Sequence, residues 1–400
     1  MSSYKAFIYN YHFTPTFTPF LYILLFISLS SNAQPIYLSE NFNQGWPTGW
    51  TTIDQDGNTP DSTVARFTDA WIIFPDIDSA KIGDSVASST SWYSPPGQAD
   101  DYMITPLIMI GSTTGVFWDA KAVDPDFSDG YELRISTTTP DIVGFMAHPP
   151  LFTTSSAPAK WTNFMVNLSA AGYQNQSVYL SWRNHSNDQF ILSIDNIIVK
   201  ELAPFDARIS GIDSLSSYSH IPIHQNPAIH LAGQITNVGF QTITDAKLVA
   251  EVLKNGVSVH EDSSQGINLN FGEWANLAMS PYFPKDTGTY TVSYFVSIDE
   301  TDSHLSNNTA FSTKSLMIND SVFARDIGPA SNGLSIGNGT TGEFGLNFSF
   351  SKTSLLHSVS VFLVNSNNIM VGKPISVKVY AFRDSPSVEV AFTDTLIVTQ

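Results

Sequence analysis

The sequence predicts an all-β protein, because its composition favours strands and its apolar residues alternate with a period of two. Phe, Tyr, Trp, Val, Ile and Thr are abundant, and 24 Gly and 22 Pro punctuate the chain as turn residues. No sustained apolar pattern of helical period is present. Because 400 residues exceed what one hydrophobic core usually holds, we expect two or three domains.

The charge balance restricts the partners that this chain can have. The formal net charge is -18, yet only 14% of the residues are charged, so Ser, Thr, Asn and Gln must cover much of the surface. Such a surface repels nucleic acid and anionic membranes, and it suits neutral or cationic partners or a divalent metal. The absence of cysteine excludes disulfides, thiolate zinc sites and cysteine nucleophiles.

Residues 1–33 have the pattern of a signal peptide. A polar lead precedes an apolar run at residues 20–29, and Ser31 and Ala33 supply a small-residue cleavage site, so that the mature chain would start at Gln34. An uncleaved anchor is the alternative, although the run is short for a membrane span. Export of a chain without cysteine predicts a bacterial protein, secreted or on the outer cell surface, that meets a membrane only through secretion or anchoring.

Residues 34–202 are predicted to form the first domain, a β-sandwich. Apolar and polar residues alternate strictly at residues 131–136 and 178–183, which places one face of each strand on a core and the other toward solvent. Turn-rich pieces at residues 94–97 and 124–130 separate these strands. This spacing is typical of a sandwich.

Seven short motifs follow one another in residues 34–202. They are Glu40-Asn41-Phe42, Pro47-x-Gly49-Trp50, Asp54-x-Asp56-Gly57, Asp100-Asp101-Tyr102-x-Ile104-Thr105-Pro106-Leu107, Tyr131-Glu132-Leu133-x-Ile135-Ser136, Trp161 with Val166-x-Leu168, and Ile194-Asp195-Asn196-Ile197. Their order resembles that of choice-of-anchor J domains, also called cleaved-adhesin domains, which occur in gingipain-type proteases and many secreted Bacteroidetes proteins. The resemblance implies a two-sheet jelly roll that binds a ligand, has no catalytic activity and leaves the cell by type IX secretion.

Residues 203–319 predict a second, immunoglobulin-like β-sandwich. Alternating residues at 246–252 and 288–296 indicate strands, and Asn255-Gly256 is a strong hairpin signal. The Asn-x-Gly turn at residues 237–239 and the Gly-x-Tyr-x-Val strand resemble CARDB-type adhesion modules. Residues 320–400 predict a third β-rich domain, with strands at 344–350, 359–363 and 377–381, that is expected to be incomplete because the sequence ends within a strand.

The turn at residues 54–58 is the best candidate for a metal site. Calcium takes six to eight oxygen ligands, and alternating acidic residues in a Gly-containing turn can supply several of them. An EF-hand is excluded, because its twelfth position is Ala65 rather than glutamate. The family resemblance implies a structural calcium that ties the first strand to the last, with four ligand residues: Glu40, Asp54, Asp56 and Asp195. The alternative is an Asx-turn, with Asp195 capping a loop.

A second acidic patch lies at residues 124–130. Its aspartates, Asp124, Asp126 and Asp129, are a weaker candidate for a cation site, since solvated turn aspartates are common.

Four residues are predicted to contact a ligand: Trp92, Tyr93, Arg183 and His185. Aromatic side chains in loops stack on sugar faces and anchor protein interfaces, and Trp71 and Tyr173 share this loop setting. Trp71, Trp118 and Trp182 are alternatively core residues.

No catalytic residues are predicted. The sequence contains neither a His-Glu-x-x-His pair nor a Gly-x-Ser-x-Gly elbow, and Asp100 and Asp101, as neighbours in a strand, should point to opposite faces. The favoured function is therefore a non-catalytic surface adhesin or substrate-binding protein that recognises an extracellular glycan or protein through jelly-roll loops. The alternatives are the accessory region of a secreted peptidase or glycoside hydrolase whose catalytic domain lies outside this sequence, and a stalk without a ligand.

Overall fold

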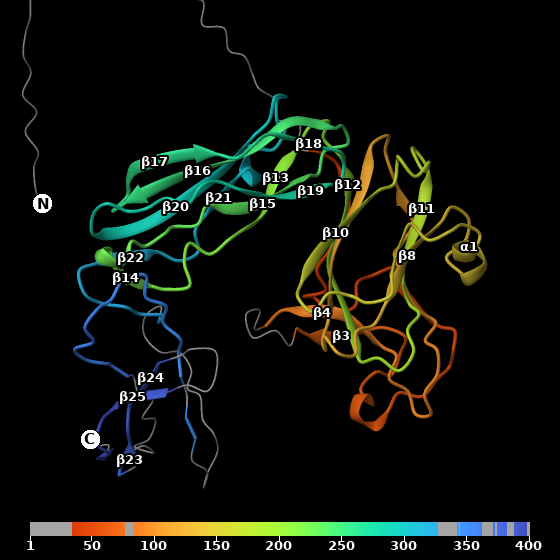
Figure 1. The fold of residues 1–400 in the computed structure, drawn as a ribbon. Coiled ribbons are helices and arrows are strands. Elements are labelled where there is room, and N and C mark those ends of the chain that lie inside the picture. Colours follow the sequence, from red (N-terminus) through yellow and green to blue (C-terminus); the bar gives the residue numbers. More distant parts are fainter. Residues whose placement is uncertain are drawn as a thin grey trace, which may run out of the picture.

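The computed structural model describes residues 34–76, 83–326, 342–343, 345–361, 371–372, 374–381 and 388–397. The predicted signal peptide, residues 1–33, lies outside the described residues. The described chain is almost entirely β-structure, which confirms the predicted fold class. Figure 1 shows two sandwiches side by side, with the C-terminal residues beyond the second.

The first sandwich has two six-stranded sheets. One sheet has the order β10-β7-β12-β4-β3, with β1 also on β12, and is built from β1 (Ile36–Glu40), β3 (Ile72–Pro75), β4 (Ser85–Thr90), β7 (Thr114–Ala122), β10 (Thr162–Asn167) and β12 (Ile191–Glu201). The other has the order β2-β5-β11-β8-β9, with β6 also on β11, and is built from β2 (Thr51–Asp54), β5 (Asp101–Ile104), β6 (Ile108–Met109), β8 (Tyr131–Ser136), β9 (Phe152–Thr154) and β11 (Ser177–Asn184).

The long strand β12 joins the two ends of this domain. Its first half pairs with β4, its second half pairs with β1, and β7 runs along its other edge. The register places Glu40 opposite Ile197, so the first strand of the domain lies directly against the last. The family resemblance implied this neighbourhood of first and last strands.

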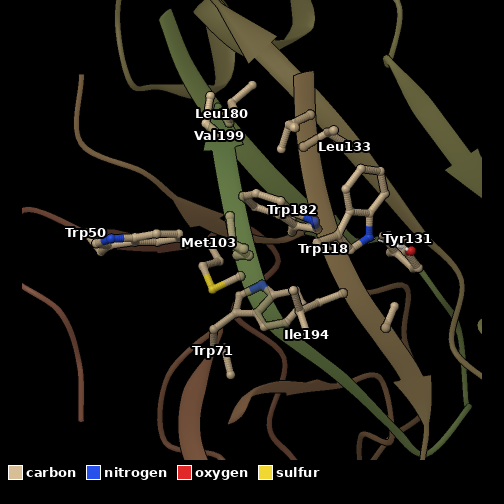
Figure 2. Packing of buried hydrophobic residues seen from close by; sticks show 14 of the residues in the cluster. Trp50, Trp71, Met103, Trp118, Tyr131, Leu133, Leu180, Trp182, Ile194 and Val199 are labelled. Carbon is tan, nitrogen blue, oxygen red and sulfur yellow. Dashed lines mark hydrogen bonds between the residues drawn. The ribbon is translucent and has the colours of Figure 1, made fainter. Parts of the chain in front are cut away.

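Aromatic residues from both sheets fill the core between them (Figure 2). The ring centroids of Trp118 and Trp182 lie 6.0 Å apart in an edge-to-face arrangement, and the indole Nε1 of Trp118 donates a hydrogen bond of 2.9 Å to the hydroxyl of Tyr131. Trp71 is 2% exposed and also belongs to this cluster, so it is a core residue and not a ligand contact. The apolar halves of residues 131–136 and 178–183 face this core, as their alternation predicted.

The alternation predicted that the polar residues of these strands face solvent. This prediction is wrong for β8. Glu132 and Arg134 of β8 are both buried, because the short helix α1 (Ile142–Met146) packs on the outer face of β8. The guanidinium of Arg134 donates to the carboxylate of Glu132 at 2.6 Å and to the backbone carbonyls of Phe145 and His148 at 3.3 Å. Alternation therefore identified the strand but not the cover on its outer face.

The second sandwich pairs a three-stranded sheet with a seven-stranded sheet. The smaller sheet contains β13 (Ala207–Ile212), β15 (Ala232–Asn237) and β19 (Trp274–Ala278). The larger contains β14 (His220–Pro222), β16 (Ile243–Lys254), β17 (Val257–Ser263), β18 (Ile267–Leu269), β20 (Gly288–Ser297), β21 (Thr309–Phe311) and β22 (Leu316–Asn319). The predicted hairpin is present: Asn255 and Gly256, both with positive φ, join β16 to β17.

The third unit has less regular structure than predicted. The described residues 345–361 form no strand, although strands were expected at 344–350 and 359–363, the latter in part outside the described residues. Two small sheets are present, β23 (Pro374–Ile375) with β26 (Leu396–Ile397), and β24 (Lys378–Ala381) with β25 (Val388–Phe392). Among all the helices in the described part of the chain, none is both long and apolar enough to span a membrane.

Candidate functional site

Several loops meet at one end of the first sandwich, which we call the loop end. It comprises five segments: 54–60, 91–100, 123–130, 155–161 and 185–190. Hydrogen bonds join four of these segments in series, and Ser128 Oγ donates to the carbonyl of Ala157 in the fifth at 2.6 Å. Asn58 Nδ2 donates to the carbonyl of Gln98 at 3.0 Å, the Gln98 amide donates to the carbonyls of His185 and Ser186, and Gly130 N donates to Ser186 Oγ at 2.6 Å. The loop end is thus one connected structure.

Three carboxylates form an acidic centre where the loop end meets β2 and β5: Asp54, Asp56 and Asp101. Each offers one oxygen within 4.8 Å of the others, and they form the one group of three or more metal-ligating side chains found in the described residues. Antiparallel pairing of β2 with β5 sets Asp54 opposite Asp101, and the turn after β2 brings in Asp56. Two of the four residues predicted for the calcium site therefore meet here, together with a third that was not predicted.

The acidic centre is held by neutral donors rather than by cationic side chains. The hydroxyl of Tyr93 donates to Asp101 Oδ2 at 2.8 Å, and Asp56 Oδ2 accepts from the backbone N of Asp100 at 2.6 Å. Asp54 Oδ1 accepts from Gly57 N, and Asp56 Oδ1 from Asn58 N, each at 2.7 Å. These turn contacts are those of the Asx-turn that was the alternative to a metal site.

Burial and like charge disfavour ionisation at this centre. Burial of Asp101, reinforced by the charges of Asp56 and Asp54 and only partly offset by the Tyr93 hydrogen bond, raises the pKa of Asp101 to about 8. A hard cation placed among the three carboxylates would remove this repulsion, and carboxylate oxygens are the ligands that calcium prefers. The three carboxylates would supply three of the six to eight oxygens that a calcium ion takes.

Glu40 and Asp195 lie outside the acidic centre. Glu40 Oε1 accepts from the backbone N of Asn41 at 3.0 Å and of Phe42 at 2.8 Å. Asp195 is buried in β12, in register with Asp119 of β7. The set of four predicted ligands is thus divided between the loop end and the sheet formed by β1, β7 and β12.

Asp101 was missed in the sequence because its partners come from a different strand. The expectation that Asp100 and Asp101 point to opposite faces is correct: Asp100 pairs with Arg183, whereas Asp101 faces Tyr93. The expectation did not reveal which strand lies beside β5. The pairing of Asp54 with Asp101 joins two separate strands, and neither strand's own sequence predicts it.

The predicted ligand contact at Tyr93 is wrong, because this side chain is 4% exposed and its hydroxyl is bonded within the acidic centre. Trp92 is half-buried, with its ring edge-on to Phe190 at 5.6 Å in a small apolar cluster that also contains Val64 and Phe67. Both aromatics support loops instead of presenting a free face. A Pro-rich turn after two aromatics gave the impression of an exposed loop.

Arg183 is also occupied by protein partners. Its Nε lies 2.6 Å from Asp100 Oδ1, its Nη1 lies 3.1 Å from Glu132 Oε2, and its guanidinium covers the ring of Tyr102. Burial opposes ionisation of Glu132, but hydrogen bonds from Arg134 and Arg183 hold the pKa of Glu132 below its usual value. Arg183 thus neutralises the outer face of β8 and β11.

His185, the fourth predicted contact, lines a surface pocket of about 410 Å³ in the loop end. The pocket lies between segments 125–130, 155–156 and 185–189. Its side chains include those of Asp126, Ser155, Ser156, Asn187 and Gln189.

The second acidic patch is divided in the structure. Asp124 accepts from the backbone N of Asp126 in an Asx-turn, whereas Asp129 is fully buried and accepts from Ser91 Oγ at 2.7 Å and Asn184 Nδ2 at 3.2 Å. Burial raises the pKa of Asp129 to about 6. These three aspartates form no common cluster among the described residues.

Comparisons with known proteins agree with the predicted family. Residues 35–199 match the family model of the Cleaved Adhesin Domain. Hemagglutinin A of Porphyromonas gingivalis is 25% identical over 224 residues, which cover 50% of this chain. The chain spans only 9% of the length of that relative.

Two solved structures resemble parts of the chain. The K3 cleaved adhesin domain of Lys-gingipain from Porphyromonas gingivalis aligns with a TM-score of 0.33 and 21% identity, covering 42% of this chain and 99% of that one. A CARDB domain from Pyrococcus furiosus, solved in complex with di-metal ions, aligns with a TM-score of 0.22 and 16% identity, covering 30% and 96%.

Proposed function

Because residues 35–199 form a cleaved adhesin domain, which is a non-catalytic adhesion module, we propose that this chain is a secreted or surface-exposed binding protein. It recognises an extracellular glycan or protein through the loop end of the first sandwich. The observation that carries this proposal is the convergence of five loops, an acidic centre and a surface pocket at that one end. The second sandwich acts as a spacer.

A calcium ion at the acidic centre is part of the proposal. Asp54, Asp56 and Asp101 would hold it, and the ion would supply the positive charge that the neutral donors around these carboxylates lack. Since Asn58 and Gln98 link this turn to the loop at residues 185–189, an ion bound there would stabilise the wall of the pocket. Its role is structural.

An array that carries both glycans and extracellular proteins tests this function. The purified full-length chain is applied with calcium and again with EDTA, beside an Asp54→Asn/Asp56→Asn double variant whose side chains are exposed or half-buried. We expect at least one ligand to be retained in calcium and weakened by EDTA and by the double variant. If the array retains no ligand, the proposed binding function is refuted and the alternative of a stalk without a ligand is favoured.

A further inference from the structure

The pocket in the loop end has the size of a small-ligand site. Its volume of about 410 Å³ falls within the range of about 300–1,000 Å³ found for ligand pockets. It lies outside the acidic centre and is reached from the protein surface through exposed residues, among them Ser155, Ser156 and Asn187.

The lining of the pocket selects a neutral, hydroxyl-rich ligand. Serine hydroxyls and side-chain amides dominate it, and each can both donate and accept hydrogen bonds, as sugar hydroxyls do. Among the described residues that line it, His185 is the one basic side chain and Asp126 the one acidic side chain. This lining, without Lys or Arg from the described chain and in a protein of net charge -18, disfavours phosphate, sulfate and other anions.

An exposed aromatic residue, Phe127, adjoins this polar lining in sequence without itself lining the pocket. Phe127 lies between Asp126 and Ser128, both of which line the pocket, and its side chain is 55% exposed. Its backbone is fixed, since the carbonyl of Phe127 accepts from Phe190 N at 3.0 Å. An exposed ring beside hydrogen-bonding groups offers an apolar face to one side of a sugar ring while hydroxyls bind the lining.

Hydrogen bonds beneath the pocket hold its walls in place before a ligand arrives. Ser186 Oγ accepts from Gly130 N at 2.6 Å and donates to the carbonyl of Gly130 at 3.0 Å. A Cβ at Gly130 would lie 2.5 Å from the carbonyl oxygen of Thr154, so the walls approach as closely as glycine allows. Ser91 and Asn184 both bond to the buried Asp129. Pre-organised walls lower the entropy lost on binding.

One polar atom at the pocket lacks a partner in the described part of the chain. His185 Nδ1 is buried without a hydrogen bond from any described residue, and His185 Nε2 lies 4.0 Å from Glu132. A buried polar atom without a partner is costly, so His185 gains from any side-chain rearrangement that lets Nδ1 reach a hydroxyl in the pocket.

We infer that this pocket binds a neutral saccharide, with Ser155, Asn187 and His185 of the lining bonding its hydroxyls and with the exposed Phe127 covering the part of the sugar ring that projects from the pocket. The inference rests on the proposed function, because it names the ligand class for the loop end. It replaces Trp92, Tyr93 and Arg183 as ligand contacts with a different set of residues around His185.

Saturation-transfer NMR on the full-length chain tests the inference. The probes are galactose, glucose, mannose, N-acetylglucosamine and lactose, with glucuronic acid as the charged comparison. We expect transfer to at least one neutral sugar, affinity about tenfold lower in Phe127→Ala and a few-fold lower in Asn187→Ala. Phe311→Ala, which alters an exposed phenylalanine of the second sandwich, should bind as the unmodified chain does.

The outcomes separate this inference from the proposed function. If Phe127→Ala and Asn187→Ala leave sugar binding unchanged, the pocket is not the saccharide site, although the proposed function of the loop end stands. The same conclusion follows if the chain binds only proteins on the array. Preference for glucuronic acid would refute the neutral ligand class. If no sugar shows saturation transfer and the array retains no ligand, both the inference and the proposed function are refuted.

Discussion

Replacing Asp129 by asparagine tests what it costs to bury this carboxyl between Ser128 and Gly130, which line the pocket. Burial raises the pKa of Asp129 from an ordinary 3.8 to about 6. Well below pH 3.8 both folded and unfolded chains are protonated at this carboxyl. As pH rises from 4 to 6, the unfolded chain loses the proton first, so folding becomes less favourable across that window. At 1.36 kcal/mol per pKa unit, about 3 kcal/mol of stability is lost by pH 7.5.

The amide introduced by Asp129→Asn carries no charge at any pH, so the variant should not show this loss. The amide keeps an oxygen for Ser91 and Asn184, but its nitrogen replaces Oδ2, which has no partner among described residues. That defect lowers the free energy of unfolding by about 1–3 kcal/mol at every pH. It therefore cancels when the change in stability between two pH values is compared for the variant and the unmodified chain.

Urea unfolding at pH 4 and pH 7.5 supplies that difference. Tryptophan fluorescence follows the first sandwich, since every Trp except Trp274 lies within residues 34–202. From pH 4 to pH 7.5 the stability of Asp129→Asn should change by about 2 kcal/mol less than that of the unmodified chain, because the unfolded carboxyl is already partly ionised at pH 4. The exposed Asp126→Asn is the control. Equal pH dependence in Asp129→Asn and the unmodified chain would refute the reasoning.

Three further predictions concern the acidic centre, the buried ion pair and the hairpin. Asp101→Asn should keep the Tyr93 hydrogen bond and the fold but abolish any rise in melting temperature with calcium; a rise equal to that of the unmodified chain would exclude Asp101 as a ligand. Arg183→Ala should lower the free energy of unfolding in urea by about 2 kcal/mol, because Asp100 and Glu132 lose a partly buried partner while Glu132 keeps Arg134, and a loss below about 1 kcal/mol would contradict this. Gly256→Ala should cost about 1 kcal/mol, because Gly256 has a φ of +80°, whereas Gly345→Ala, with open space around it, should change little.

Local sequence patterns were sufficient to predict individual strands and the family. Alternation predicted the buried faces of β8, β11, β16 and β20, and the Asn255-Gly256 pair predicted its hairpin, because a period of two and a two-residue turn are properties of adjacent residues. The seven motifs predicted the cleaved adhesin domain, because the order of motifs that is typical of the family can be read directly from the sequence.

The candidate site was predicted only in part because it depends on which strands lie side by side. Asp54 meets Asp101 through the pairing of β2 with β5, and Tyr93 turns inward to bond Asp101, neither of which the separate segments reveal. Likewise the polar residues of β8 are buried because α1 covers them, and this cover comes from a later part of the chain. Exposure of loop aromatics is equally a tertiary property: Phe127 is exposed whereas Tyr93 is not.

Calcium titration followed by two-dimensional amide NMR tests whether a cation at the acidic centre organises the loop end. We expect saturable shifts for the amides of Gly57, Asn58 and Asp100, whose nitrogens donate to the acidic centre, and also for residues 185–189, which Gln98 connects to it. An absence of saturable shifts, or shifts confined to residues outside the loop end, would contradict the claim.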